Sequence, residues 1–227
     1  MTLGERLRDI QTRMKGAAEA AGRSPRDIRL VAVAKTVPAE RVQQVVDEGQ
    51  TLIGENYVQE FLTKAEHVQG ATWHFIGHLQ SNKVKKVVGR VAMIHSVDRL
   101  SLAEEISSRC VALHKKMPIL LEVNLGSEIS KSGVAPGEVL TLARACVHLP
   151  GVRLRGLMAL PPPADDPESS RPHFRHLRQL AEQLKAEGLV GEEAPELSMG
   201  MSHDFEVAIA EGATLIRVGT ALFGARG

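Results

Sequence analysis

The chain has 227 residues, of which 43% are hydrophobic and 24% are charged, with a formal net charge of +1. This length is enough for one large domain with its own core, and the composition is ordinary for a globular protein. The balanced charge and the 3% of aromatic residues argue against nucleic-acid binding, which needs a basic surface and stacking rings. The apolar runs are too short to cross a bilayer and the N-terminus is charged. We therefore expect a cytoplasmic protein without a membrane partner.

The first elements of the chain are an amphipathic helix over about residues 3–21 and a buried strand over residues 30–34. Lys35 follows the strand at once, and Pro38 disfavours a helix at the residue before it, so a turn begins near Lys35. An ammonium group at the carboxyl end of a buried strand lies where α/β folds place their chemistry, and such a lysine can attack carbonyl carbons. The structural alternative is a lysine that reaches solvent or pairs with a carboxylate.

The rest of the chain repeats this alternation of a short apolar strand and a helical stretch, without any break in composition. The expected strands are residues 51–53, 72–76, 91–94, 118–123, 152–160, 196–198 and 214–218, and the helices between them include 40–48, 57–67, 99–113, 136–148 and 202–210. Eight such units predict a single-domain α/β protein over residues 1–227, a (β/α)₈ TIM barrel preceded by an extra N-terminal helix. An open doubly wound sheet is the alternative fold, although both glycine-rich nucleotide-binding fingerprints are missing from the sequence.

The loops after the seventh and eighth strands have the composition of an anion site. Residues 198–202 read Ser-Met-Gly-Met-Ser, and Ser202 stands where the cap of the next helix is expected. Gly219 and Thr220 follow the last strand and add further donors. In barrels these two loops commonly hold a phosphate, because helix N-termini offer free N–H groups. Each loop alone also fits an ordinary capped helix or tight turn.

Arg217 lies inside the apolar eighth strand, where an arginine needs a partner, either a carboxylate or the acceptor atom of a ligand. A ligand that satisfies Lys35, the two loops and Arg217 needs an aldehyde, a phosphate and a ring acceptor. Pyridoxal 5′-phosphate (PLP) has these features. Lys131 is the rival lysine, although its polar loop predicts a protonated side chain. His95 closes the fourth expected strand and is either a site residue or a hydrogen-bonded core residue.

The motifs of this sequence resemble those of the pyridoxal 5′-phosphate homeostasis proteins over nearly the whole chain. The matching segments are residues 30–38 (LVAVAKTVP), 53–60 (IGENYVQE), 73–83 (WHFIGHLQSNK), 131–133 (KSG), 155–158 (RGLM), 197–202 (LSMGMS) and 216–224 (IRVGTALFG). The resemblance implies a barrel like the N-terminal domain of alanine racemase, without the C-terminal β domain, and PLP held as a Schiff base on Lys35.

The same resemblance assigns roles to further residues. It places Ser202, Gly219 and Thr220 at the phosphate and Arg217 at the ring nitrogen. It also implies that Asn56, His74 and Met158 line the cofactor, together with Ser198 and Met201 from the loop at residues 198–202.

In function, the resemblance implies a protein that carries PLP within the cell and helps to balance vitamin B6 and amino-acid pools, without established catalytic turnover. Apo forms of PLP-dependent enzymes are the possible protein partners, and a monomer is expected. Two alternatives stay open: a PLP-dependent enzyme of the same fold type, such as an amino-acid racemase, and a lysine-dependent aldolase that needs no cofactor.

Overall fold

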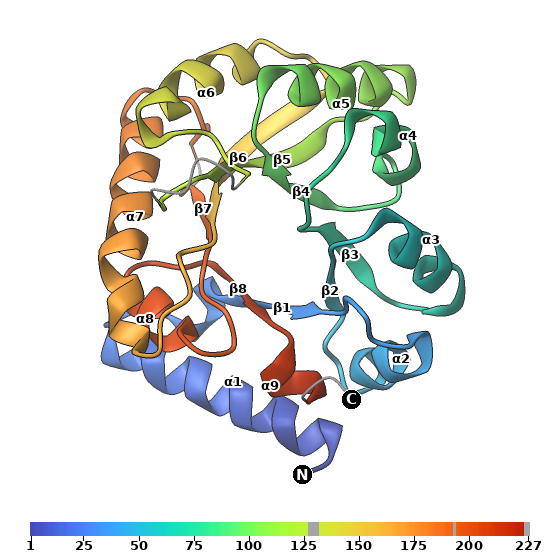
Figure 1. Ribbon diagram of the computed structural model, residues 1–227, viewed down its shortest axis with the longest axis vertical. Coiled ribbons are helices and arrows are strands. Elements are labelled where there is room, and N and C mark those ends of the chain that lie inside the picture. The colour runs from blue at the N-terminus through green and yellow to red at the C-terminus, as the bar shows by residue number, and fades with distance from the viewer. Residues whose placement is uncertain (127–131, 193, 225–227) are drawn as a thin grey trace.

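The computed structural model describes residues 1–126, 132–192 and 194–224. Within these residues, eight parallel strands close into a barrel in chain order, with helices around the outside (Figure 1). The strands are β1 (Arg29–Val33), β2 (Leu52–Glu55), β3 (Thr72–Phe75), β4 (Met93–Val97), β5 (Met117–Val123), β6 (Val152–Ala159), β7 (Glu196–Ser198) and β8 (Leu215–Val218). The predicted (β/α)₈ architecture is confirmed, and the open sheet is excluded.

The helices follow the strands in the expected alternation. They are α1 (Leu3–Ala20), α2 (Ala39–Asp47), α3 (Val58–His67), α4 (Val84–Val87), α5 (Leu100–Ala112), α6 (Val139–Val147), α7 (Arg171–Ala186), α8 (Phe205–Ala210) and α9 (Thr220–Phe223). The N-terminal helix α1 packs along α8 and α9 at the seam where β8 meets β1 (Figure 1). Among the described helices, none combines the length and the apolar character that crossing a membrane requires.

Alternation along β1 sets the direction of its side chains. Leu30, Ala32 and Ala34 belong to the large core between the barrel and its helices, whereas Val31 belongs to a separate cluster inside the barrel. Because successive side chains of a strand point to opposite faces, Val33 and Lys35 follow Val31 on the interior side. The sequence of β1 thus aims Lys35 at the carboxyl-end mouth of the barrel.

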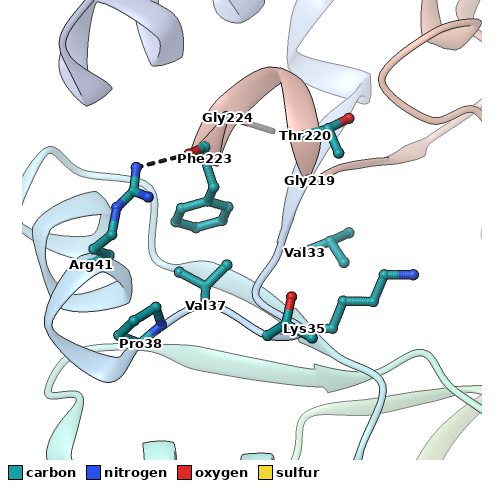
Figure 2. Close-up of a pocket in the computed structure, with 10 residues that line it drawn as sticks. Val33, Lys35, Val37, Pro38, Arg41, Gly219, Thr220, Phe223 and Gly224 are labelled. Carbon is teal, nitrogen blue, oxygen red and sulfur yellow. Dashed lines mark hydrogen bonds between the residues drawn. The ribbon is translucent and has the colours of Figure 1, made fainter. Parts of the chain in front are cut away.

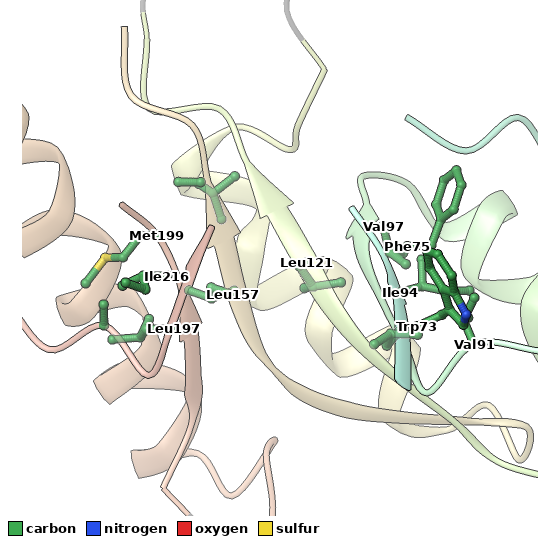
Figure 3. Packing of buried hydrophobic residues seen from close by; sticks show 14 of the residues in the cluster. Trp73, Phe75, Val91, Ile94, Val97, Leu121, Leu157, Leu197, Met199 and Ile216 are labelled. Atoms are coloured by element: carbon green, nitrogen blue, oxygen red, sulfur yellow. The ribbon is translucent and has the colours of Figure 1, made fainter. Parts of the chain in front are cut away.

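The large outer core holds most of the buried apolar surface. Trp73 and Phe75 of β3 point outward, and the Trp73 ring meets the Phe61 ring of α3 edge-on at 5.7 Å between centroids. Figure 3 shows these side chains grouped with Ile94 and Val97 on one side of the barrel, and separate groups beside β7 and β8. Burial of side chains of this size contributes about 1.5–3 kcal/mol each, so this core dominates the stability of the barrel.

The barrel interior is apolar in its middle and charged at its amino end. Its apolar cluster consists of Val31, Met93, Leu120, Met158 and Leu215. At the amino end Glu196 pairs with Arg29 and Arg155. The described side chains therefore fill the interior from its amino end through its middle, and they leave the carboxyl end to hold a ligand.

Four elements, β2, β4, α6 and α8, have boundaries that differ from the sequence prediction by two residues or more. The helix expected over residues 136–148 begins as a 3₁₀ turn, Pro136–Glu138, and α6 itself begins at Val139. Strand β2 continues through Gly54 and Glu55, where a turn was expected, because the buried Glu55 carboxylate pairs with Lys64 of α3. Strand β4 runs from Met93 to Val97, and not over residues 91–94, because its polar His95 is hydrogen-bonded inside the barrel. Helix α8 begins at Phe205, and not at Ser202.

Gly77, just after β3, provides a stability test of the barrel mouth. A Cβ atom at Gly77 would lie 2.2 Å from the backbone oxygen of Asn56. We expect Gly77→Ala to lower the free energy of unfolding by about 1–3 kcal/mol, as overpacking does. Gly16→Ala is the matched control, because nothing lies within 4 Å of its added Cβ, and it should stabilise α1 by about 0.5–1 kcal/mol. Urea unfolding measures both, and a neutral Gly77→Ala would contradict the close approach.

Candidate functional site

A cavity of about 300 Å³ opens at the carboxyl ends of β1, β2 and β8. It is lined by Val33, Lys35, Asn56, Ile76, Leu160, Met201, Ser202, His203, Arg217, Gly219 and Thr220. The structure thus brings together seven of the residues that the sequence singled out: Lys35, Asn56, Met201, Ser202, Arg217, Gly219 and Thr220. These come from four separate stretches of the chain, and barrel closure places them side by side.

Lys35 stands between this cavity and a second cavity of about 460 Å³. The two cavities also share the lining residues Val33, Gly219 and Thr220. Arg41 lines the second cavity, where its Nη2 donates to the backbone oxygen of Phe223 at 2.8 Å. Figure 2 shows the Lys35 side chain extending away from Arg41 and Phe223. Lys35 is half-buried and lines both cavities.

Ser202 gathers backbone donors at the start of α9. Its Oγ accepts hydrogen bonds from the N–H groups of Gly219 and Ala221, each at 3.3 Å. The expectation that Ser202 caps the next helix is wrong, because Asp204 occupies that place and its carboxylate holds the Met201 N–H at 2.7 Å. Since both accepted bonds use oxygen lone pairs, the Ser202 proton is left to donate. The Ser202 and Thr220 hydroxyls, together with the two N–H groups whose long bonds to Ser202 an incoming anion can replace, form a set of donors suited to an anion.

Arg217 projects from β8 and is only 4% exposed. Its Nη1 donates to Ser198 Oγ at 2.6 Å and its Nη2 to the backbone oxygen of Ala159 at 2.9 Å. Among the described residues it forms no ion pair with a carboxylate. Burial lowers the pKa of Arg217 to about 10, so the guanidinium stays charged at neutral pH. A buried cation with only neutral partners suits a ligand acceptor at its free edge.

A chain of hydrogen bonds runs from Arg217 across the barrel interior. Ser198 Oγ lies 2.9 Å from His95 Nδ1, and His95 Nε2 lies 2.8 Å from His74 Nδ1. Burial lowers the pKa of His74 to about 3 and that of His95 well below its usual value, so both rings are neutral. Ser198 accepts from Arg217, and the direction of the next two bonds depends on the tautomers of the neutral rings: a His95 ring with its proton on Nε2 accepts from Ser198 at Nδ1 and donates to His74.

His74, Ser198 and Met158 are the three predicted site residues that do not line the cavity. His74 and Ser198 reach it through Arg217, and Met158 lies in the apolar cluster inside the barrel. Their direct contact with a cofactor stays a prediction. The hydrogen-bonded core interpretation of His95 is confirmed. The rival Lys131 lies outside the described residues.

Asn56 carries the one orphaned polar atom in the cavity lining of the described chain. Its side-chain Oδ1 is buried and has no hydrogen-bond partner there, although its backbone N–H donates to Glu55 at 2.6 Å. Leaving a buried polar atom unpaired costs about 1–3 kcal/mol, so such an atom at a cavity wall points to a ligand.

Sequence reasoning missed four lining residues: Val33, Ile76, Leu160 and His203. Strand alternation identifies two of them, because Val33 and Ile76 each lie two residues from another inward-facing position, Lys35 and His74. His203 gave no signal in the sequence. Its Nε2 lies 2.8 Å from the backbone oxygen of Asp165, in the loop after β6, a contact that only the folded chain reveals.

Comparison with known proteins gives the family. The family model of the N-terminal domain of alanine racemase matches residues 6–227. The pyridoxal phosphate homeostasis protein of Aquifex aeolicus is 46% identical over 228 residues, which is 100% of this chain and 99% of that protein. This chain belongs to the pyridoxal phosphate homeostasis protein family.

The chain is also similar to solved structures. PipY of Synechococcus elongatus, solved with PLP bound, is 34% identical, with a TM-score of 0.86 over 98% of this chain and 100% of that one. Alanine racemase from Corynebacterium glutamicum is 16% identical, with a TM-score of 0.72 over 96% of this chain and 61% of that one. The second likeness shows a shared barrel fold, which members of the homeostasis family have in common with racemases.

The buried histidine pair makes the stability of this family member depend on pH. The folded-state pKa of His74 lies below the value of about 6.5 expected in the unfolded chain, so the unfolded chain binds more protons below pH 6.5. The contribution of such a histidine to the free energy of unfolding is therefore fully present above pH 6.5. It falls on acidification below that pH, by about 1.4 kcal/mol per pH unit for each histidine.

We expect His74→Gln to reduce the slope of unfolding free energy against pH between about pH 4 and 6. The reduction should be about 1.4 kcal/mol per pH unit, which corresponds to one proton. Urea titrations at several pH values measure that slope. The exposed His176 gives the control, His176→Gln. An unchanged slope in His74→Gln would show that His74 is protonated in the folded protein.

Proposed function

We propose that this chain carries PLP as a Schiff base on Lys35 and serves intracellular PLP homeostasis. The observation that carries the proposal is one cavity that holds a half-buried amine, a set of anion donors and a buried guanidinium without a carboxylate partner among the described residues. The relatives' name and the PLP-bound PipY structure support it.

The residues of the cavity fit the groups of PLP one by one. Ser202, Thr220 and the N–H groups of Gly219 and Ala221 would hold the phosphate. Arg217 would face the ring nitrogen, and the orphaned Asn56 Oδ1 would accept from the phenolic hydroxyl. Lys35 would supply the amine that condenses with the aldehyde carbon of bound PLP, with water as the leaving group. Ile76 and Leu160 would cover the faces of the ring.

We further propose that the chain is a carrier and not an enzyme. A charged guanidinium at the ring nitrogen keeps that nitrogen unprotonated, because like charges repel, and so weakens the ring as an electron sink. Racemisation also needs a base on each side of the substrate. The only tyrosine in the sequence, Tyr57, is 54% exposed at the start of α3. A cofactor-free aldolase would not need Arg217.

The proposal includes the wider expectations from the sequence. The chain acts as one domain over residues 1–227, as a monomer in the cytoplasm, and it passes PLP to apo forms of PLP-dependent enzymes. The half-buried Lys35 between two cavities supports such transfer, since another amine can approach the attachment point.

Lys35→Ala tests the attachment point. We expect the purified wild-type chain incubated with PLP and then borohydride to gain the cofactor mass on the peptide containing Lys35. The Lys35→Ala chain should gain none and should keep its unfolding midpoint, because the apolar side chains of β1 make the core. Lys131→Ala is the control for the rival lysine and should label normally. Undiminished labelling of Lys35→Ala would move the attachment point elsewhere.

Exchange of the α-hydrogen in D₂O tests the carrier against the racemase. With either enantiomer of alanine or serine, we expect no exchange above that seen with free PLP. Rapid exchange with loss of chirality, abolished by Lys35→Ala, would make the protein an enzyme. In that case, slower exchange in His203→Gln than in wild type would identify His203 as the second base. His203 is the histidine that lines the cavity in the described chain.

A further inference from the structure

Lys64 of α3 makes a buried contact that the proposed function does not use. It is 5% exposed, which is rare for a lysine. Its Nζ donates to the backbone oxygen of Ala34 at 2.6 Å, to Glu55 Oε2 at 2.7 Å and to Glu60 Oε2 at 2.6 Å. An ammonium has three protons, so these three acceptors satisfy it completely.

The two peptide groups that flank Lys35 both belong to this network. Ala34 accepts from Lys64, and Thr36 donates its N–H to Glu60 Oε2 at 2.7 Å. One carboxylate oxygen of Glu60 thus receives both the Thr36 N–H and the Lys64 ammonium. Thr36 has a φ of 61°, a left-handed conformation that costs energy in a threonine and needs such support.

The other carboxylate, Glu55, extends the network to the next cavity residue. Its Oε1 accepts from the N–H groups of Asn56 at 2.6 Å and Tyr57 at 3.2 Å. Burial raises the pKa of Glu55, and the hydrogen bonds from Lys64 and from these N–H groups oppose that rise. One ammonium therefore joins the backbone beside Lys35, after β1, to the backbone at Asn56, after β2.

Stability alone does not account for this arrangement. A buried ion pair generally stabilises a protein no better than apolar side chains of the same size would. The exposed pair of Arg109 and Glu105 on α5, also four residues apart, joins only two side chains of one helix. The Lys64 network instead holds the main chain at two residues that line the cavity.

We propose that Lys64, Glu60 and Glu55 are positioning residues that fix the main chain around Lys35 and Asn56, and so aim both side chains into the cavity. The inference rests on the proposed attachment of PLP to Lys35. Without the network, the peptide groups on either side of Lys35 lose their Lys64 and Glu60 partners. The turn is then left to the 3.0 Å bond from the Val37 N–H to the Ala34 oxygen, and the Lys35 side chain is free to take other directions. Held in place, the amine has fewer orientations to lose when it reacts, and preorganisation of this kind raises affinity.

Glu60→Ala is the test, because Glu60 is 31% exposed on its helix and its loss leaves Glu55 still paired with Lys64. Glu105→Ala is the matched control, with an equal side-chain exposure of 31% and an ion pair of the same spacing. In the PLP-free chain, we expect Glu60→Ala to speed hydrogen exchange at the Thr36 amide by about tenfold or more, with no change in Glu105→Ala.

The same variants are then compared for binding. We expect Glu60→Ala to weaken PLP and pyridoxal alike by about tenfold, because the defect lies at the amine and not at the phosphate. Glu60→Gln should restore most of the affinity, since its one carbonyl oxygen can replace the oxygen that serves Thr36 and Lys64.

Each outcome separates the positioning role from the proposed function. If wild type carries the cofactor on Lys35 but Glu60→Ala matches Glu105→Ala in exchange and affinity, the positioning role is overturned and the carrier stands. A loss of global stability with an unchanged Thr36 exchange rate and affinity overturns it equally. If wild type gains no cofactor mass at Lys35, both proposals fail together.

Discussion

A closed parallel barrel forces every second side chain of each strand into an interior that water does not reach. Apolar side chains can fill that space freely, and polar ones are stable there only when their hydrogen bonds are met. This constraint accounts for the order seen along the barrel axis. An ion cluster around Glu196 closes the amino end, five apolar side chains fill the middle, and the polar residues lie toward the carboxyl end. The cavity begins where this filling stops.

The polar layer shows a buried charge next to groups that burial keeps neutral. Arg217 donates to Ser198, whose hydroxyl meets His95, and His95 meets His74. Burial lowers the pKa of both rings, and the charge of Arg217 lowers that of His95 further. Outside the barrel, the Lys64 ammonium meets three acceptors. Lys64 holds the main chain beside two residues that line the cavity, Lys35 and Asn56, whereas Arg217 lines the cavity itself.

Much of this architecture could be predicted from the sequence, because it depends on local patterns. The alternation of apolar strands and helices gave the barrel, and residues at strand ends gave Lys35, Arg217 and the two loops. The errors have a common physical cause. Strands β2 and β4 continue through Glu55 and His95, polar residues whose burial depends on distant partners, Lys64 and His74. A pattern of apolar residues cannot reveal such pairs. The misplaced start of α8 likewise depends on Asp204, whose carboxylate accepts from Met201 N–H and from Ser170 Oγ.

The filled interior limits the route by which a ligand can enter and leave the cavity. Because Arg217 and the apolar cluster beneath it form the floor, a ligand that binds in the described cavity cannot pass through the barrel, and it would enter and leave on the carboxyl-end face. The half-exposed Tyr57 and Leu160 stand at that face. Under the proposed transfer, a receiving protein would have to approach the face through which the ligand first arrived, and whatever covers this face would stop delivery and refilling together.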